Sequence, residues 1–230
     1  MDTTKNRLQV VKSRIEAACA ASGRYARDIV LVAVSKGQSI DAVRSAYAAG
    51  QRDFGESYAQ ESLAKMDALR DLPLVWHYIG PVQSNKTRPI AERFDWVHSV
   101  DRLKIAERLS AQRPAAMPPL NVCVQVNISG EASKSGIAPD AAGELAEAVA
   151  KLPRLRLRGL MGIPEPTQDE ALARARFHSL AALQHTLCDR GMALDTLSMG
   201  MSDDFEQAIA AGSTMIRVGT AIFGARKRQP

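Results

Sequence analysis

The stretch Ile29-Val-Leu-Val-Ala-Val-Ser-Lys36 is a short apolar run that stops at a serine and a lysine. A turn follows at Gly37, and a helix-like stretch then runs over residues 39–49, with Ser39 at its start and Gly50 after its end. Serine is favoured where a helix begins and glycine where one ends. The stretch therefore predicts a unit of one strand, one turn and one helix.

The same unit recurs along the chain. Strand-like apolar runs lie at 29–35, 52–55, 74–80, 96–100, 120–127, 156–163, 194–199 and 214–219. Helix-like stretches lie between them, at 39–49, 57–70, 84–93, 101–112, 139–151, 168–190 and 203–211. Such alternation indicates right-handed βαβ units and a parallel sheet, and eight repeats favour closure into a (β/α)8 TIM barrel.

An open, doubly wound sheet is the alternative α/β fold. In its dinucleotide-binding form, G-x-G-x-x-G would follow the first strand, where this chain reads VSKGQS. The sequence therefore speaks against a dinucleotide cofactor.

One more helix is predicted before the first strand, over residues 3–22. Its apolar side chains recur at helical spacing until Ser22 and Gly23 interrupt the pattern. These side chains are Leu8, Val11, Ile15, Ala18 and Cys19. Because no Pro-, Gly- or Ser-rich linker divides the chain, residues 1–230 are expected to form a single domain, with a flexible basic tail over 225–230.

Composition and charge limit the kinds of partner. Aromatic residues make up only 5% of the chain, too few for a surface that stacks nucleic-acid bases. The net charge is +5, and the densest basic spots are Arg154, Arg156 and Arg158 and the tail residues 226–228. Without a nucleic-acid-binding motif, these spots are interpreted as a solvated face and a tail, and the charge favours an anionic small ligand.

The cysteines and the N-terminus indicate the compartment. Cys19, Cys123 and Cys188 lie far apart, are odd in number and form no CxxC pair, so neither a disulfide framework nor a zinc site is predicted. The chain starts with polar residues, and its apolar runs are too short to span a bilayer. We therefore expect a cytoplasmic protein without a membrane partner.

Candidate functional residues lie where the first and last two strands end. The working groups of a TIM barrel are found at the C-terminal ends of its strands, and phosphate is commonly held after strands seven and eight. Lys36 follows the first strand, while Ser198-Met199-Gly200 and Arg217-Val-Gly219-Thr220 end the last two. Either glycine-containing loop alone is also ordinary turn chemistry, but both together, opposite a lysine, favour a phosphate site.

The helix that follows strand seven is a poor phosphate ligand by itself. Ser202 is expected to cap this helix. Asp203, Asp204 and Glu206 occupy its first turn, where carboxylates repel an anion. We therefore expect Gly219 and Thr220 to hold the phosphate, with Ser198 assisting.

A lysine amine beside a bound phosphate suits a Schiff base with a phosphorylated aldehyde cofactor. Arg217 is the candidate contact for the ring nitrogen of that cofactor, because its guanidinium can only donate hydrogen bonds. A ring nitrogen that accepts from an arginine stays unprotonated, which disfavours carbanion chemistry. Asn85, in the stretch after strand three, is a further candidate contact. The four histidines have no metal-binding spacing.

Together, these motifs resemble those of the pyridoxal phosphate homeostasis proteins, relatives of the alanine racemase N-terminal barrel. The resemblance covers nearly the whole chain. It rests on the segments 32–36 (VAVSK), 54–57 (FGES), 76–80 (WHYIG), 83–86 (QSNK), 126–136 (VNISGEASKSG), 159–161 (GLM), 197–204 (LSMGMSDD) and 217–224 (RVGTAIFG). This chain departs from the family pattern at Ser57, where relatives often have asparagine, and at Pro81-Val82, where they often read His-Leu.

The resemblance implies pyridoxal 5′-phosphate (PLP) bound covalently to Lys36, with Arg217 near the pyridine nitrogen. It also implies phosphate contacts around Ser198, Gly219 and Thr220. The implied role is intracellular PLP homeostasis and supply, with PLP-dependent apoenzymes as exchange partners, rather than robust catalysis.

Two other functions stay open at this point. One is a single-domain PLP-dependent amino-acid racemase that uses Lys36 and a second base such as Tyr58. However, related barrel enzymes bring further acid–base groups from a second domain, for which this chain has no equivalent segment. The other is a basic binding protein without a cofactor. We expect a monomer, since the domain that creates the racemase dimer is missing.

Overall fold

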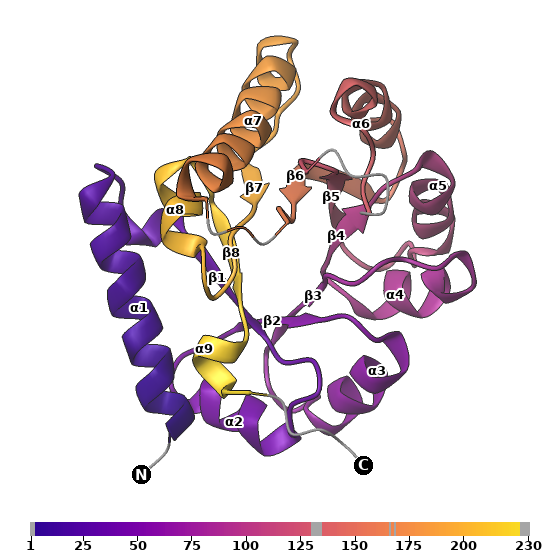
Figure 1. Cartoon of the computed structure of the whole chain (residues 1–230). Coiled ribbons are helices and arrows are strands. Elements are labelled where there is room, and N and C mark those ends of the chain that lie inside the picture. The colour runs from indigo at the N-terminus through magenta and orange to yellow at the C-terminus, as the bar shows by residue number, and fades with distance from the viewer. Residues whose placement is uncertain (1–2, 130–134, 166, 168, 226–230) are drawn as a thin grey trace.

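Eight parallel strands form a closed barrel in the computed structural model, which describes residues 3–129, 135–165, 167 and 169–225 (Figure 1). The strands are β1 (Val30–Val34), β2 (Asp53–Glu56), β3 (Val75–Tyr78), β4 (Trp96–Val100), β5 (Leu120–Val126), β6 (Leu155–Gly162), β7 (Thr196–Ser198) and β8 (Met215–Val218). The barrel closes between β1 and β8, where Val32 lies opposite Arg217. The predicted TIM barrel is confirmed, and the open-sheet alternative is wrong.

Helices surround the barrel (Figure 1). They are α1 (Thr3–Ala21), α2 (Ile40–Ala48), α3 (Ala59–Ala68), α4 (Thr87–Arg93), α5 (Leu103–Gln112), α6 (Ala142–Ala150), α7 (Glu170–Asp189) and α8 (Phe205–Ala210). Two predicted helices, 84–93 and 139–151, begin with a 3-10 turn, over Ser84–Lys86 and Pro139–Ala141. The helix expected over 203–211 is shorter, because it begins at Phe205.

Two short helical elements of the described chain were not predicted, one of them a 3-10 turn over Ala26–Asp28. α9 (Thr220–Phe223) follows β8 directly, and the Gly219 carbonyl accepts hydrogen bonds from the amides of Ile222 and Phe223 at 2.9 Å each. Four residues are too few to show helical periodicity in a sequence. Of the predicted basic tail, residues 226–230 lie outside the described residues.

The turn residues behave as expected in the first unit. The Ser39 hydroxyl accepts a hydrogen bond from the Ala42 amide at 3.2 Å and so caps α2. Gly50 has a φ of +92°, which a side chain would strain. Ser202, by contrast, does not cap α8, because its hydroxyl accepts from the Ala221 amide at 3.4 Å.

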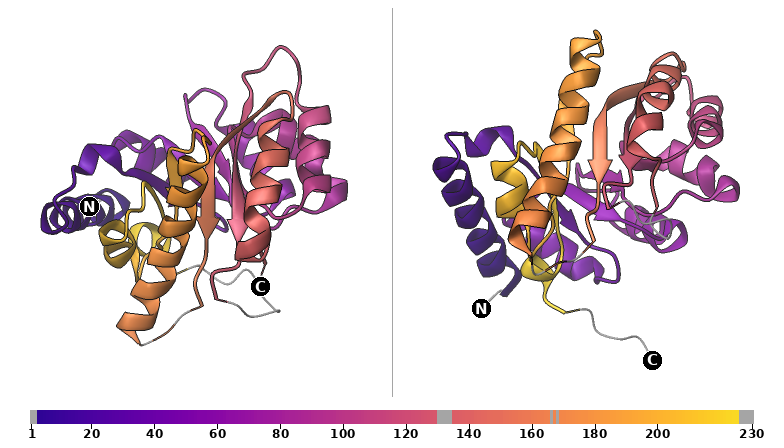
Figure 2. Two further views of the ribbon diagram at one scale, coloured as in Figure 1. Left: turned by 90° about the horizontal axis from the view of Figure 1, so that it is seen from above. Right: turned by 45° about the horizontal axis from the view of Figure 1, so that its top comes forward.

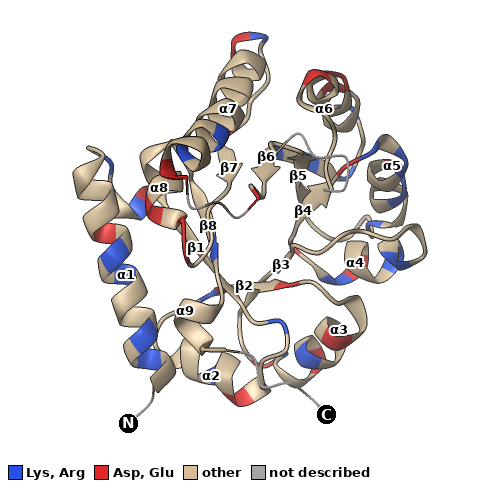
Figure 3. Cartoon of the chain, viewed as in Figure 1, with Lys and Arg blue, Asp and Glu red and all other residues tan. Residues whose placement is uncertain are grey.

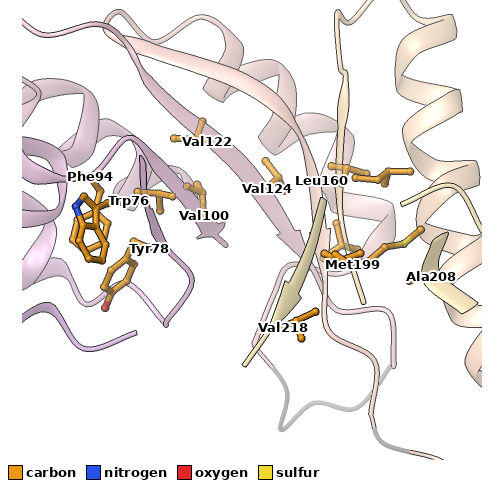
Figure 4. Close-up of a cluster of buried hydrophobic side chains, with 14 of the residues drawn as sticks. Trp76, Tyr78, Phe94, Val100, Val122, Val124, Leu160, Met199, Ala208 and Val218 are labelled. Atoms are coloured by element: carbon orange, nitrogen blue, oxygen red, sulfur yellow. The ribbon is translucent and has the colours of Figure 1, made fainter. Parts of the chain in front are cut away.

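Alternation along the strands divides the apolar side chains into two clusters. In β1, Ala33 joins the large cluster between the barrel and the helices, whereas Val32 joins a small cluster with Trp96 and Met161. Figure 4 shows part of the large cluster. Successive strand residues point to opposite sides of the barrel wall. The small cluster therefore fills one level of the barrel interior, and polar side chains can occupy the levels above and below it.

The N-terminal helix closes one side of the helical ring. α1 lies against α8 and α9, as Figure 2 shows from two further directions. Leu8, Val11 and Cys19 are buried there, and Arg14 lies over the ring of Phe205 at 4.5 Å. The extra helix predicted from the sequence is therefore part of the domain core.

Charged residues of both signs are distributed over the outer helices (Figure 3). Of the arginines interpreted as a solvated face, Arg154 and Arg156 are exposed, while Arg158 pairs with Asp195 at 2.7 Å. None of the helices in the described part of the chain is long and apolar enough to cross a membrane.

Candidate functional site

A cavity of about 240 Å³ opens at the C-terminal ends of the strands. It brings together four of the residues predicted from the sequence: Lys36, Arg217, Gly219 and Thr220. The other lining residues are Val34, Ser57, Ile79, Ile163, Met201, Ser202 and Asp203. Segments more than 180 residues apart thus meet at one opening because β1 pairs with β8.

The backbone around Lys36 is held on both sides. Before it, the Ser35 amide donates to the Gly55 carbonyl at 2.9 Å, and the buried Ser35 hydroxyl donates to Oε1 of Glu56 at 2.6 Å. After it, Gly37 has a φ of +69° and donates its amide to Oε1 of Glu61 at 2.7 Å. Lys36 therefore extends from a fixed turn.

A charged network lies beside this turn. Nζ of Lys65 donates to Oε1 of Glu56 at 2.6 Å, to Oε1 of Glu61 at 3.1 Å and to the Ser35 carbonyl at 2.7 Å. Burial raises the pKa of Glu56, while Lys65 acts in the opposite direction. The carboxylates of Glu56 and Glu61 thus have a cation of their own in Lys65, separate from Lys36.

Arg217 is the buried cation of the cavity, on β8 next to the strand that leads to Lys36. Its NH1 group donates to Oγ of Ser198 at 2.5 Å, and its NH2 group donates to the Gly162 carbonyl at 3.1 Å. Burial lowers the pKa of Arg217 to about 10, so the guanidinium stays charged at neutral pH. The arginine is held by two neutral oxygens.

Ser198 does not line the cavity. Its fully buried hydroxyl lies between Arg217 and Nδ1 of His98, 2.8 Å from the latter. The barrel register explains this, because Ser198 pairs with Met215, two residues before Arg217, and so enters the interior one layer lower. Ser198 was expected to assist in holding the phosphate. In the structure its hydroxyl contacts Arg217 and does not line the cavity.

Three further candidates also lie away from the cavity lining. Met199 is fully buried in the large apolar cluster, on the other side of the wall from Ser198. Gly200 has a φ of +97°, and a Cβ there would lie 2.7 Å from Cβ of Ala208. Asn85 is exposed in a 3-10 turn. Gly200 shapes the loop, and its carbonyl accepts from the Arg217 amide at 3.0 Å.

Two hydroxyl groups on the lining, those of Ser57 and Ser202, were not among the residues predicted from the sequence. Ser202 lies in the segment 197–204, which carried the family resemblance, but its predicted place was a helix cap. Ser57 is one of the two departures from the family pattern, so this departure falls on the cavity. The other departure, Pro81-Val82, is not part of the cavity lining.

The donor set suits a small anionic ligand with a flat apolar part. The cavity offers an amine, a guanidinium and the hydroxyls of Ser57, Ser202 and Thr220, between apolar walls that include Ile79 and Ile163. Among the described residues, no cluster of three or more His, Cys, Asp or Glu side chains could hold a metal ion.

Comparisons with known proteins agree with this fold. The family model described as alanine racemase, N-terminal domain, matches residues 8–227. A protein of Pseudomonas aeruginosa named pyridoxal phosphate homeostasis protein is 62% identical over 226 residues, covering 98% of this chain and 97% of that protein. A protein of the same name from Escherichia coli K12 is 52% identical over 229 residues, covering 98% of both.

Solved structures give the same picture. PipY of Synechococcus elongatus PCC7942 with PLP bound has a TM-score of 0.84 and 36% identity, covering 96% of this chain and all of PipY, at 100%. An alanine racemase of Clostridium difficile 630 has a TM-score of 0.77 at 14% identity, and the match covers 98% of this chain and 57% of the racemase chain. The likeness to the racemase is one of fold alone.

Proposed function

Because this chain belongs to the pyridoxal phosphate homeostasis proteins, within the alanine racemase N-terminal domain family, we propose that it binds PLP in the cavity at the barrel mouth. Its role is to hold and supply PLP for homeostasis, without robust turnover. The observation that carries the proposal is that Lys36, Arg217, Gly219 and Thr220 line one small cavity.

Lys36 is the proposed covalent attachment point. With PLP in the cavity, this amine would condense with the cofactor aldehyde, forming a carbon–nitrogen double bond with the loss of one water molecule. The linkage is reversible by hydrolysis, which suits a protein that must release its ligand. The fixed turn between Ser35 and Gly37 supports this role, because it holds the lysine at the cavity wall.

The phosphate group is proposed to lie at the β8 end of the cavity. The hydroxyls of Ser202 and Thr220 supply donors there. Gly219 lets the end of β8 pack closely on β1, since a Cβ at this position would be 3.3 Å from both Cβ and the carbonyl oxygen of Val34. Asp203 also lines the cavity, so its carboxylate repels a phosphate bound near it, as expected from the sequence.

Arg217 is proposed to donate to the pyridine nitrogen. Its hydrogen bonds to Ser198 and to the Gly162 carbonyl use two of the five N–H donors that a guanidinium carries. A nitrogen that accepts from Arg217 is unprotonated, and the ring is then a weak electron sink. When bound, PLP supplies a reactive aldehyde, and these residues hold it without strengthening its carbanion chemistry.

The racemase alternative needs a second base at the cavity. Tyr58, the candidate from the sequence, is 56% exposed and is not among the lining residues. Exchange of the α-proton of amino acids in heavy water tests this alternative. We expect no rapid, saturable exchange by the PLP-loaded protein.

Reconstitution with PLP tests the proposal itself. The visible spectrum is recorded before and after borohydride reduction, in the wild type and in Lys36→Ala and Lys86→Ala. Lys86, half-buried after β3, is the matched control. We expect the wild type and Lys86→Ala to retain cofactor after reduction and dialysis, and Lys36→Ala to lose it. A wild-type chain that takes up no PLP would contradict the proposal.

The proposal includes a cytoplasmic monomer that exchanges PLP with PLP-dependent apoenzymes. Sedimentation of the loaded protein tests the oligomeric state, and a stable dimer would overturn that part. Transfer is tested by mixing the loaded protein with a PLP-dependent apoenzyme and measuring the activity regained.

A further inference from the structure

A row of polar side chains runs through the inside of the barrel. Nε2 of His77 lies 3.0 Å from Oδ1 of Asp53, and Nδ1 of His77 lies 3.0 Å from Nε2 of His98. Nδ1 of His98 lies 2.8 Å from Oγ of Ser198, which accepts from Arg217 at 2.5 Å. We call Asp53, His77, His98 and Ser198 the interior relay. It joins the start of β2 to the cavity at the opposite end of the barrel.

The relay is shielded from water except at one end. His77, His98 and Ser198 are fully buried, whereas the Asp53 side chain is 29% exposed. The ring of His77 stacks on Trp96, with centroids 5.5 Å apart and planes 12° from parallel. Buried polar groups without water must satisfy one another, so the proton positions in the relay are constrained.

Those constraints allow one arrangement with neutral histidines. The carboxylate of Asp53 can only accept, and this sets the direction of the whole row. The hydroxyl of Ser198 accepts from Arg217, and its own hydrogen goes to Nδ1 of His98. His98 then carries its proton on Nε2 and donates to Nδ1 of His77. His77 carries its proton on Nε2 and donates to Asp53.

A neutral His98 agrees with its surroundings. Burial, His77 and Arg217 lower its pKa well below the ordinary value. The two charges of the row therefore stand at its ends, the guanidinium of Arg217 and the carboxylate of Asp53. Every hydrogen bond between them points from the arginine toward the aspartate, an arrangement in which successive bonds polarise one another.

We propose that the interior relay positions Arg217 toward the cavity, and that Asp53, at the far end of the barrel, fixes the direction of its hydrogen bonds. Ser198 and the Gly162 carbonyl together fix the guanidinium at two of its nitrogens. Asp53, His77, His98 and Ser198 are positioning residues, and only Arg217 faces the ligand. The effect on PLP rests on the proposed function, whereas the proton arrangement does not.

Nitrogen NMR of the full-length protein without added PLP tests the proton arrangement. Long-range ¹H–¹⁵N correlations distinguish the two neutral histidine forms. His178 and His185, exposed on α7, serve as internal controls. We expect His77 and His98 each to carry a single proton on Nε2 at neutral pH. A proton on Nδ1 of His98 would overturn the proposal.

Variants test the coupling to the cavity. Ser198→Ala removes the link beside Arg217, and Asp53→Ala removes the terminal acceptor at a partly exposed site, where no core cavity results. Asp53→Asn retains an acceptor oxygen, and Asp71→Ala removes a surface partner of Arg44 as the control. Thermal melting shows whether each variant is folded.

We expect Ser198→Ala to weaken PLP binding roughly tenfold, the equivalent of one hydrogen bond to a charged group. Asp53→Ala should change the histidine resonances and shift the absorption maximum of bound PLP, and Asp53→Asn should restore both. Folded Asp53→Ala and Ser198→Ala proteins with wild-type spectra and affinity would overturn the proposal. If the wild type binds no PLP, the proposed function fails while the NMR result still decides the relay.

Discussion

The two sides of the cavity hold their cations by different means. On the β1–β2 side, a charged network of Glu56, Glu61 and Lys65 secures the turn that carries Lys36. On the β7–β8 side, Arg217 contacts neutral oxygens, and no described carboxylate forms an ion pair with it. A carboxylate would accept two of its donors in a bidentate pair. We call the β7–β8 side the neutral side, because neutral oxygens hold its cation, and the β1–β2 side the charged side. The neutral side therefore leaves Arg217 available to a ligand, whereas the charged side stabilises the turn that carries Lys36.

The largest effect should come from breaking the charged side. Lys65→Met leaves Glu56 buried without its cation, and we expect a loss of about 3–5 kcal/mol in unfolding free energy. Urea titration measures it. The double variant Lys65→Met with Glu56→Gln should recover much of this loss. A single variant within about 1 kcal/mol of wild type would show that the network is not needed for stability.

On the neutral side, loss of the Arg217 guanidinium should weaken PLP binding. Arg217→Met keeps an unbranched apolar stem but removes the charged hydrogen-bond donor, and we expect PLP affinity to fall by roughly 10- to 100-fold. Equilibrium dialysis measures it, with Arg156→Met, exposed on β6, as the control. Unchanged affinity in Arg217→Met would remove the arginine from the site.

The buried His98 of the interior relay should affect stability in acid. The pKa of His98 is lowered in the folded state, so below pH 6.5 the unfolded chain binds a proton that the folded chain does not. Stability is therefore lost progressively as pH falls below 6.5. His98→Gln should flatten this slope in urea titrations, whereas His185→Gln should keep it. Parallel slopes in wild type and His98→Gln would contradict the account.

The smallest effect should come from the backbone between the two sides. Gly219→Ala places a Cβ 3.3 Å from Cβ of Val34, so β1 and β8 must separate slightly. We expect PLP affinity to fall by less than tenfold, which is under about 1.4 kcal/mol. Gly143→Ala on α6, where the Cβ would meet Leu187 at 3.4 Å, is the control. A loss in Gly219→Ala as large as in Arg217→Met would mean that Gly219 is a main determinant of binding.

The fold and half of the candidate residues were predictable because they follow from order along the chain. Alternating strands and helices specify a parallel barrel, and the strand ends of such a barrel meet at one opening. Lys36, Arg217, Gly219 and Thr220 could therefore be assigned to one cavity before their contacts were known.

The remainder depends on register, which the sequence does not display. Ser198 enters the barrel one layer below Arg217, and Met199 faces the opposite side of the wall. The histidines of the interior relay come from two strands and meet Asp53 and Ser198 from two others, so no local spacing reveals them.

The most direct test of the central claim is to locate the covalent attachment. The PLP-loaded protein is reduced with borohydride, digested and analysed by mass spectrometry. We predict that the added cofactor mass is carried by the peptide that contains Lys36, and that it disappears in Lys36→Ala. Cofactor mass on a peptide containing Lys65 or Lys86 in place of Lys36, or none on any peptide, would contradict the account.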